Sequence, residues 1–589
     1  LDGPYTQILL DSRPIFSALS GVYGIEQIPA SMIERVEVMR GGGSALFGSS
    51  AIAGTINIIT KEPMRNSGML SHTITGIGDG DAFDNSTALN ASLVTDDQRA
   101  GLYIFGQNRH RSAYDHDGDG YSEIPKLHGQ TIGFRSFLKT TTYSKLTFEY
   151  HHMEEFRRGG DLLNRPPHEA NVAEQTEHSI NGGGLKFDYF SPNENHRFNV
   201  FASAQHINRD SYYGPGDRDP LDAYGNTTDL NWMAGSQYVY SFGKCIFMPS
   251  DLTAGIEFNQ DKLEDNMWGY NRTVDQKVNI GSAFLQNEWK NDHWGFLIGG
   301  RLDKHNLIDH VIFSPRANLR YNPTENINLR FSYSSGFRAP QAFDEDLHVE
   351  NVGGNVAMVE LADNLKEERS QSLSASADIY HRFGAFQVNF LVEGFYTKLS
   401  DVFALTDGEV VDGILTRTRH NASGAQVLGL TLEGKMAYLN KIQVQAGVTL
   451  QQSHYSKPHI WNKEAPAVKK MMRTPNTYGY FTATYTPIKP LSIALSGTYT
   501  GSMLVPHEPV PGFLENPITV NTKDFFDIGL KAAYDFKLYK SMNLQLNAGI
   551  QNIFNAYQDD FDKGADRDSG YIYGPSLPRS FFAGVKISY

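Results

Sequence analysis

The chain has 589 residues, of which 12% are aromatic and 55 are glycine, so it is rich in rings and turns. Its formal net charge of −14 at pH 7 argues against a nucleic-acid partner, because such proteins neutralise phosphates with clusters of Lys and Arg. Cys245 is the only cysteine, which excludes an intrachain disulfide, and no run of 18 apolar residues predicts a transmembrane helix.

The first informative segment is RGGGSALFGSSAIAGTINIIT, residues 40–60, which follows the strand-like RVEVM of residues 35–39. Two of its glycines and a serine match a phosphate-binding loop, G-x-x-x-x-G-K-[ST]. Ser49 stands where that loop carries its lysine, however, and the β-branched TINIIT of residues 55–60 predicts a strand where the loop needs a helix. We therefore predict a strand, a glycine-rich loop and a second strand, and no nucleotide site.

An acidic segment, YDHDGDGYSE, follows at residues 114–123. Its carboxylates have the spacing of positions 1, 3, 5 and 9 of a calcium loop, at Asp115, Asp117, Asp119 and Glu123. Lys126 occupies the position of the bidentate glutamate and no helices flank the segment, so it is not an EF-hand. We predict a loop ordered by Ca²⁺, with a solvated acidic turn as the alternative.

From about residue 65 onward, stretches of alternating apolar and polar residues recur between loops rich in Asp, Asn, Gly, Ser and Pro. INLRFSYS at 327–334, IQVQAGVTL at 442–450 and MNLQLNAGI at 542–550 are examples, and the terminal SFFAGVKISY ends on an aromatic residue. A soluble sandwich also alternates, but here the polar faces carry Arg, Gln and Asn, which suit a wet lumen. We predict a transmembrane barrel, which must close because lipid cannot satisfy unpaired backbone groups.

The length of this region indicates the size of the barrel. Residues 65–589 give about 24 residues for each strand and its connection if the barrel has about 22 strands, as large plugged outer-membrane barrels do. A porin of 16 to 18 strands would need longer loops and stays an alternative.

Three segments carry a family resemblance. IERVEVMRGGGSALFGSSAIAGTINIITKEP, residues 33–63, resembles the second half of the plug domain of TonB-dependent outer-membrane receptors. GFRAPQAFDEDLHV at 336–349 and ADNLKEERSQS at 362–372 are similar to the family's F-R-A-P and N-P-N-L boxes, although Ala-Asp replaces Asn-Pro in the second box. GIQNIFNAYQ at 549–558 resembles the family's penultimate strand.

The resemblance implies an all-β membrane protein: a 22-stranded antiparallel transmembrane β-barrel at residues 65–589, with the C-terminal part of a plug domain, residues 1–64, in its lumen. The family's TonB box and first plug subdomain are missing before Leu1, so we expect the sequence to represent a trimmed or partly ordered product; the alternative is a chain that could not be energised as it stands. The glycines Gly41–Gly43 would let the plug approach the barrel wall closely. Arg40 is similar to the plug arginine that pairs with barrel carboxylates, with a solvated arginine as the alternative.

The plug loop of residues 11–29 is similar in length and in its S-G-x-x-x-[I/L]-x-Q-[I/F]-P ending to that of cobalamin receptors. These receptors also hold Ca²⁺ in an outer barrel loop, as predicted for residues 114–123. The resemblance implies ligand contacts from the plug loop at Phe16, Ser17, Leu19 and Tyr23.

Haem receptors of the family place a histidine between the two boxes, where this chain has His348. The plug loop contains no second histidine that could act as the other axial ligand, which argues against haem. We predict Phe343 and His348 as ligand contacts, with an ordinary loop histidine as the alternative for His348. Ferric siderophores are a further alternative ligand.

The resemblance therefore implies active import of a large scarce nutrient, most simply cobalamin or a related corrinoid, across the outer membrane of a Gram-negative bacterium. The implied partners are TonB with ExbB and ExbD, the transported ligand and outer-membrane lipid. Likeness to receptors of gut and oral Bacteroidetes implies one further partner, a surface lipoprotein that acts as a lid on the receptor. A passive porin or an adhesive barrel is the alternative of another class, and no residue pattern predicts an enzyme.

Overall fold

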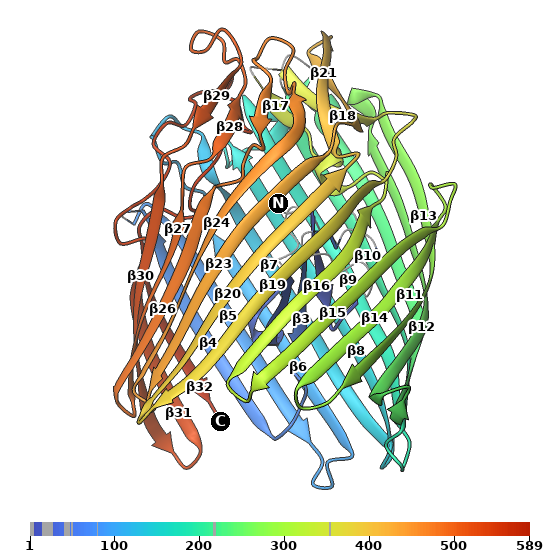
Figure 1. Cartoon of the computed structure of the whole chain (residues 1–589). Coiled ribbons are helices and arrows are strands. Elements are labelled where there is room, and N and C mark those ends of the chain that lie inside the picture. Colours follow the sequence, from blue (N-terminus) through green and yellow to red (C-terminus); the bar gives the residue numbers. More distant parts are fainter. Residues whose placement is uncertain are drawn as a thin grey trace.

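The computed structural model describes residues 5–13, 28–40, 48, 51–52, 54–78, 80–215, 219–352 and 355–589. They form a tall barrel with a small sheet inside its lumen, and the C-terminus lies at the lower rim in Figure 1. Among these residues, no helix combines the length and the apolar character that crossing a bilayer would require.

The barrel wall has 22 antiparallel strands within the described residues. Its first half comprises β4 (Ser67–Ile77), β5 (Ala82–Val94), β6 (Ala100–Arg111), β7 (Ser122–Thr141), β8 (Ser144–Gly160), β9 (Val172–Phe190), β10 (His196–Pro215), β11 (Tyr224–Cys245), β12 (Met248–Met267), β13 (Arg272–Lys290) and β14 (Trp294–His305). Its second half comprises β15 (Ile312–Thr324), β16 (Ile327–Arg338), β19 (Glu368–Phe383), β20 (Phe386–Ser400), β23 (Ala425–Tyr438), β24 (Ile442–His459), β26 (Thr477–Ile488), β27 (Leu491–Thr500), β30 (Phe525–Tyr539), β31 (Met542–Gln551) and β32 (Ser580–Ser588). Strand β32 pairs with β4, so the wall has no free edge and the predicted closed barrel of about 22 strands is confirmed.

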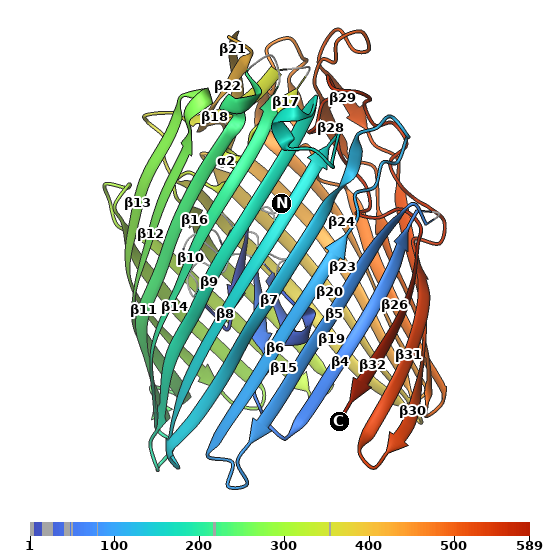
Figure 2. The same ribbon diagram turned by 180° about the vertical axis from the view of Figure 1, so that it is seen from behind.

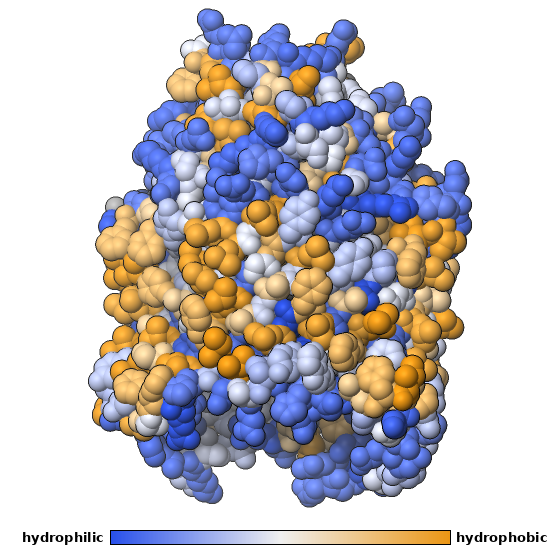
Figure 3. Space-filling view, viewed as in Figure 1, coloured by the Kyte–Doolittle hydropathy of each residue, from blue (hydrophilic) through white to orange (hydrophobic). Residues whose placement is uncertain are grey.

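The predicted alternation separates a lipid face from a lumen face. Leu329 and Phe331 of β16 are 38% and 49% exposed on the outside, and Val585 and Ile587 of β32 face the same way. On the face that Figure 3 shows, apolar side chains gather in a band across the middle of the barrel, between polar ends. A band of this kind matches the hydrocarbon layer of an outer membrane.

The sheet inside the lumen belongs to the N-terminal region, residues 1–64, which we call the plug. Strand β3 (Gly54–Thr60) lies between β1 (Thr6–Leu10), which is parallel to it, and β2 (Ile33–Arg40), which is antiparallel. The short helix η3 (Ala30–Met32) leads into β2. Figures 1 and 2 show these strands inside the barrel from opposite sides. The segment after the glycine-rich loop is thus a strand, as predicted.

One end of the barrel has short turns and the other has long loops, which marks the long-loop end as the outer one. The outer loops contain η4 (Pro167–Glu169), η5 (Pro220–Ala223), η6 (Trp268–Tyr270), α2 (Asp344–Leu347), β17 (Glu350–Val352), β18 (Asn355–Leu361), β21 (Phe403–Val411), β22 (Ile414–Asn421), β25 (Val468–Lys470), β28 (Leu504–His507) and β29 (Ile518–Asn521). The order β17-β18-β22-β21 joins the loop after β16 to the loop after β20 in one sheet.

Candidate functional site

A buried charge cluster attaches the plug to one side of the barrel. Arg135 of β7 donates to the carboxylate of Asp11, and its guanidinium lies 3.4 Å from Glu149 of β8. Arg13 of the plug pairs with Glu149 at 3.0 Å, and all four side chains are at most 10% exposed. Because a buried charge without its partner is costly, this cluster holds the plug in one orientation.

The predicted contact of Arg40 stays a prediction. Arg40 ends β2, and its side chain lies outside the described part of the structure, as do Gly41–Gly43. The described close approach to the wall is at Gly48, where φ is +80° and an added Cβ would lie 3.3 Å from the guanidinium of Arg301. Arg301 pairs in turn with Asp303 at 2.8 Å.

A cavity of about 450 Å³, which we call the mouth cavity, lies at the outer ends of β6 to β10. Its aromatic lining consists of Tyr121, Tyr213, Phe561 and Tyr571. Among the described residues, its charged lining consists of four arginines and five carboxylates: Arg109, Arg111, Arg157, Arg567, Glu123, Glu174, Glu350, Asp562 and Asp568. The described lining thus carries a formal charge of −1, which suits a large ligand that is close to neutral.

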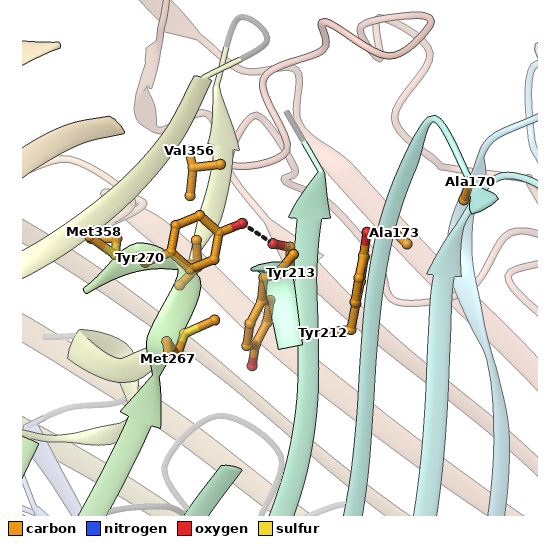
Figure 4. Close-up of a cluster of buried hydrophobic side chains, with 10 residues drawn as sticks. Ala170, Ala173, Tyr212, Tyr213, Met267, Tyr270, Val356 and Met358 are labelled. Atoms are coloured by element: carbon orange, nitrogen blue, oxygen red, sulfur yellow. Dashed lines mark hydrogen bonds between the residues drawn. The ribbon is translucent and has the colours of Figure 1, made fainter. Parts of the chain in front are cut away.

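One wall of the mouth cavity is a packed apolar cluster (Figure 4). The hydroxyl of Tyr270 donates to the backbone carbonyl of Tyr213, and Met267 and Val356 pack in the same cluster. Tyr213 and Val356 also line the cavity, so residues from β10, β12 and β18 build this wall together. Dense packing makes the wall a preformed surface rather than an adaptable one.

Arg338 of the F-R-A-P box is the centre of a second buried charge cluster, which we call the rim hub: Arg338, Glu345, Asp346, Glu368 and Arg419. Arg338 donates to Glu345 of α2, and its guanidinium lies 3.8 Å from Glu368 of β19. Arg419 of β22 pairs with Asp346 at 2.5 Å and with Glu345 at 3.4 Å. The rim hub thus connects two outer loops to the barrel wall.

The rim hub also reaches the plug. Glu368 is fully buried and accepts hydrogen bonds from the hydroxyl of Tyr5 at 3.0 Å and from the backbone N–H of Phe403 at 2.6 Å. Tyr5 comes immediately before β1 of the plug, whereas Phe403 opens β21 of an outer loop. One carboxylate therefore contacts both the plug and a loop that faces the medium.

Burial in α2 raises the pKa of Asp346 to about 6, although Arg419 counteracts the rise. Phe343, a predicted ligand contact, packs over the guanidinium of Arg338 at 4.1 Å and belongs to the surroundings of the rim hub. His348, the other predicted contact, lies with its ring 5.2 Å from Tyr213, which lines the mouth cavity. The structure thus places His348, but not Phe343, beside the mouth cavity.

The acidic loop predicted to bind calcium lies beside the mouth cavity. Asp115, Asp117 and Glu123 place carboxylate oxygens within 4.8 Å of one another. Asp119 points elsewhere, because it pairs with Arg567 at 2.5 Å. Arg567 also pairs with Glu123 at 3.0 Å, so the loop after β31 rests against the acidic loop. The structure brings three of the four predicted residues together.

A third charged cluster, which we call the loop network, surrounds Arg417 of β22. Arg417 pairs with Glu350 at 2.7 Å, with Asp407 at 3.0 Å and with Glu508 at 3.3 Å. Glu508 also accepts a hydrogen bond of 3.0 Å from Asn462. These residues belong to the loops that follow β16, β20, β24 and β27. Burial, together with Asp407 and Asp568, raises the pKa of Glu508 to about 7 despite Arg417.

Sequence reasoning missed most of this site. The F-R-A-P motif contains Arg338, so the motif could have drawn attention to it, but nothing in the sequence marks Arg417 or Arg419. The predicted plug contacts Phe16, Ser17, Leu19 and Tyr23 lie outside the described residues and stay predictions.

Comparisons with known proteins agree with this architecture. Residues 67–553 match the family model "TonB dependent receptor-like, beta-barrel", and residues 1–55 match "TonB-dependent Receptor Plug Domain". The siderophore receptor PirA from Acinetobacter baumannii superposes with a TM-score of 0.78 at 17% identity, over 99% of this chain and 90% of that one. At this identity the likeness concerns the fold.

Among curated proteins, an iron-regulated outer membrane virulence protein of Vibrio cholerae is 26% identical over 376 residues, 60% of this chain and 53% of that protein. A vitamin B12 transporter, BtuB, of Vibrio vulnificus is 23% identical over 349 residues, 57% of this chain and 52% of that protein. The matches thus span about half the length of these relatives. They come from Vibrio and add no support for the predicted likeness to Bacteroidetes receptors.

Proposed function

Because the chain belongs to the family of TonB-dependent receptors of the Gram-negative outer membrane, we propose that it binds a large scarce nutrient at the mouth cavity and imports it. The observation that carries this proposal is a preformed cavity of about 450 Å³ at the outer end of a barrel whose lumen holds a plug. TonB, with ExbB and ExbD, would supply the energy by pulling on the plug. The buried charges that attach the plug to the wall argue against a passive porin, which would not need them.

We propose a corrinoid as the ligand of the mouth cavity. Its nearly balanced charge and its four aromatic side chains suit a large ligand that is close to neutral and rich in hydrogen-bonding groups. A relative carries the name vitamin B12 transporter. A ferric siderophore is the second candidate, because four arginines line the same cavity and another relative is named as iron-regulated.

Calorimetry of the purified receptor should detect binding of cyanocobalamin in the presence of Ca²⁺. Tyr121→Ala, which removes one ring of the mouth cavity, should weaken binding about tenfold. Tyr143→Ala changes an exposed tyrosine in a short inner turn and should leave the affinity unchanged. Binding of a ferric siderophore alone would reject the corrinoid, and binding of neither would reject the proposed function.

We propose in addition that the acidic loop binds Ca²⁺. Asp115, Asp117, Asp119 and Glu123 carry four negative charges, and Arg567 and Lys563 contact them with two positive ones. The balance of −4 and +2 leaves −2, which a divalent cation would neutralise. Oxygen ligands within 4.8 Å of one another on Asp115, Asp117 and Glu123 suit Ca²⁺, which prefers carboxylates in flexible geometry.

Titration with CaCl2 should protect the loop at 112–121 from protease, with a Kd of about 0.1–1 mM, as in exposed extracellular calcium modules. Asp117→Asn should abolish the protection, because it removes one of the three clustered carboxylates. Asp97→Asn, in an inner turn, is the matched control. Equal cleavage with and without Ca²⁺ would favour the solvated acidic turn.

A further inference from the structure

A square of four polar side chains lies on the outside of the barrel wall, near the outer ends of β6 and β7, and has no part in the mouth cavity. His110 pairs directly with His128 across the two strands, and Asn108 pairs directly with Gln130. All four side chains are exposed. Figure 2 shows the two strands side by side in the wall. We call these four residues the outer-wall square.

The position of the square follows from the alternation along both strands. Arg109 and Arg111 of β6 line the mouth cavity inside the barrel, so His110 between them points outward. On β7, Ile132 also faces outward and is 59% exposed, two residues nearer the inner end than Gln130. Because Ile132 belongs to the apolar lipid face, the square lies on the outer side of that face, where water and dissolved ions reach it.

The two imidazole rings of the square are close enough to share one ion. Their centroids are 5.9 Å apart, and the ring planes are inclined by 55°. Side chains that are directly opposite on antiparallel strands have Cβ atoms about 4.5–5.5 Å apart. From that separation, side-chain rotation can bring one nitrogen of each ring to within about 2.0–2.1 Å of a common metal ion. His110 and His128 therefore have the spacing of two nitrogen ligands to one ion.

The two amides supply oxygen ligands at the neighbouring corners. Nε2 of Gln130 lies 3.4 Å from Nε2 of His128. Rotating the amide by 180° exchanges its nitrogen and its oxygen, so the same position can present an oxygen to an ion. Asn108 carries the second amide, opposite Gln130. Lys126 of β7 and Glu154 of β8 flank the square with opposite charges, so its surroundings do not repel a cation.

Packing does not account for the histidine pair. Both rings are exposed, so their contact buries little apolar surface. Like charges directly opposite each other on neighbouring strands destabilise a sheet, so the pair is unfavourable whenever both rings carry an extra proton. A metal ion needs both rings neutral and benefits from the same spacing. The arrangement thus favours a bound ion over an empty pair.

We propose that the outer-wall square binds one divalent transition-metal ion, with His110 and His128 as nitrogen ligands and with amide oxygen and water in the remaining positions. Imidazole suits Cu²⁺, Ni²⁺ and Zn²⁺, whereas Ca²⁺ and Mg²⁺ prefer oxygen ligands. Of these ions, Cu²⁺ binds a given donor set most tightly. An ion held by both histidines joins β6 to β7 at the base of the acidic loop, whichever nutrient the receptor imports.

The first test is calorimetry with CuCl2 on the purified receptor after treatment with a chelator. The unchanged receptor should bind one ion at its tightest site. His110→Asn and His128→Asn should each weaken that binding at least about tenfold, because each removes one of the two nitrogen ligands. Both residues are exposed, so neither change should disturb the barrel. Unchanged affinity in either variant would overturn the site.

Two further variants serve as controls. His72→Asn changes another exposed histidine on the outside of the wall, on β4, and should leave the affinity for Cu²⁺ unchanged. Asp117→Asn changes the acidic loop and should leave it unchanged as well. If Asp117→Asn weakened binding as much as the histidine variants do, the ion would belong to the acidic loop and the proposal would be wrong.

The second test identifies the ligand atoms. The electron paramagnetic resonance spectrum of the receptor with one equivalent of Cu²⁺ should show splitting from two nitrogen nuclei. In His128→Asn it should show splitting from one nitrogen at most. Splitting from fewer than two nitrogen nuclei in the unchanged receptor would contradict the proposed pair of histidine ligands.

Discussion

Replacing Arg338 with methionine is expected to release the loop at 339–367 from the barrel rim, at a cost of about 3–5 kcal/mol. Glu368 is fully buried, and Arg338 is one of the groups that balance its charge and that of Glu345. Methionine keeps part of the packing against Phe343 but leaves two carboxylates without this guanidinium. Uncompensated burial of charge is the reason for the large effect.

Limited proteolysis of the purified receptor measures this release, because the loop contains α2 and connects to β22 through Arg419. Faster cleavage within 339–367, with an intact barrel, is the expected result. Arg330→Met is the matched control: it lies on the same strand, is exposed and contacts an amide oxygen of Asn328. Cleavage of Arg338→Met at the unchanged rate would mean that the rim hub does not hold the loop.

Replacing Glu508 with glutamine is expected to stabilise the loop network at pH 8 and to leave it unchanged near pH 5. The pKa of Glu508 is raised from 4.5 to about 7, so the folded loops hold its proton more tightly than the unfolded chain does. Stability from this group is therefore greatest below about pH 4.5 and decreases as the pH rises through 7. The shift corresponds to at most about 3 kcal/mol, and to about 2 kcal/mol when solvent screening is allowed for.

Glutamine cannot ionise, so the variant escapes this loss while it keeps an oxygen that can accept from Asn462. The measurement is the difference in hydrogen-exchange protection of the loop at 501–524 between the variant and the unchanged receptor, from pH 5 to pH 9. The difference should grow with pH. Glu515→Gln, an exposed residue of the same loop, should give none. A constant difference would show that burial and the neighbouring Asp407 and Asp568 do not raise the pKa of Glu508.

The alternation along the chain predicted the barrel correctly because the information is local. In β16, side chains two residues apart lie on the same face, so Leu329 and Phe331 both face lipid, regardless of which strands pair with β16. The strand at 55–60 was predictable for the same reason, since its β-branched residues favour extended backbone. Length alone left the strand count open, because 16 to 18 strands with longer loops fitted the same number of residues; the family resemblance favoured 22 strands.

The charged clusters were not predictable in this way. The chain has 66 acidic and 52 basic residues, so the sequence offers many partners for any one arginine. Arg338 and Arg419 are 81 positions apart and share Glu345 only because two outer loops meet at the rim. Asp119 shows that local spacing can also mislead. Its position in the sequence fits a calcium loop, but its carboxylate pairs with Arg567, which lies far along the chain. Ion pairing depends on distances between loops, which local sequence does not encode.

The sequence by itself determined a closed transmembrane barrel with a plug strand pair and a family-specific rim motif, because periodicity and short motifs act within one strand or turn. Only the tertiary structure decided where the plug is attached, which loops share the rim hub, and that the rim hub contacts the plug through Tyr5. The physical reason is closure of the barrel, which brings β7 and β20 to face a common lumen although some 250 residues separate them.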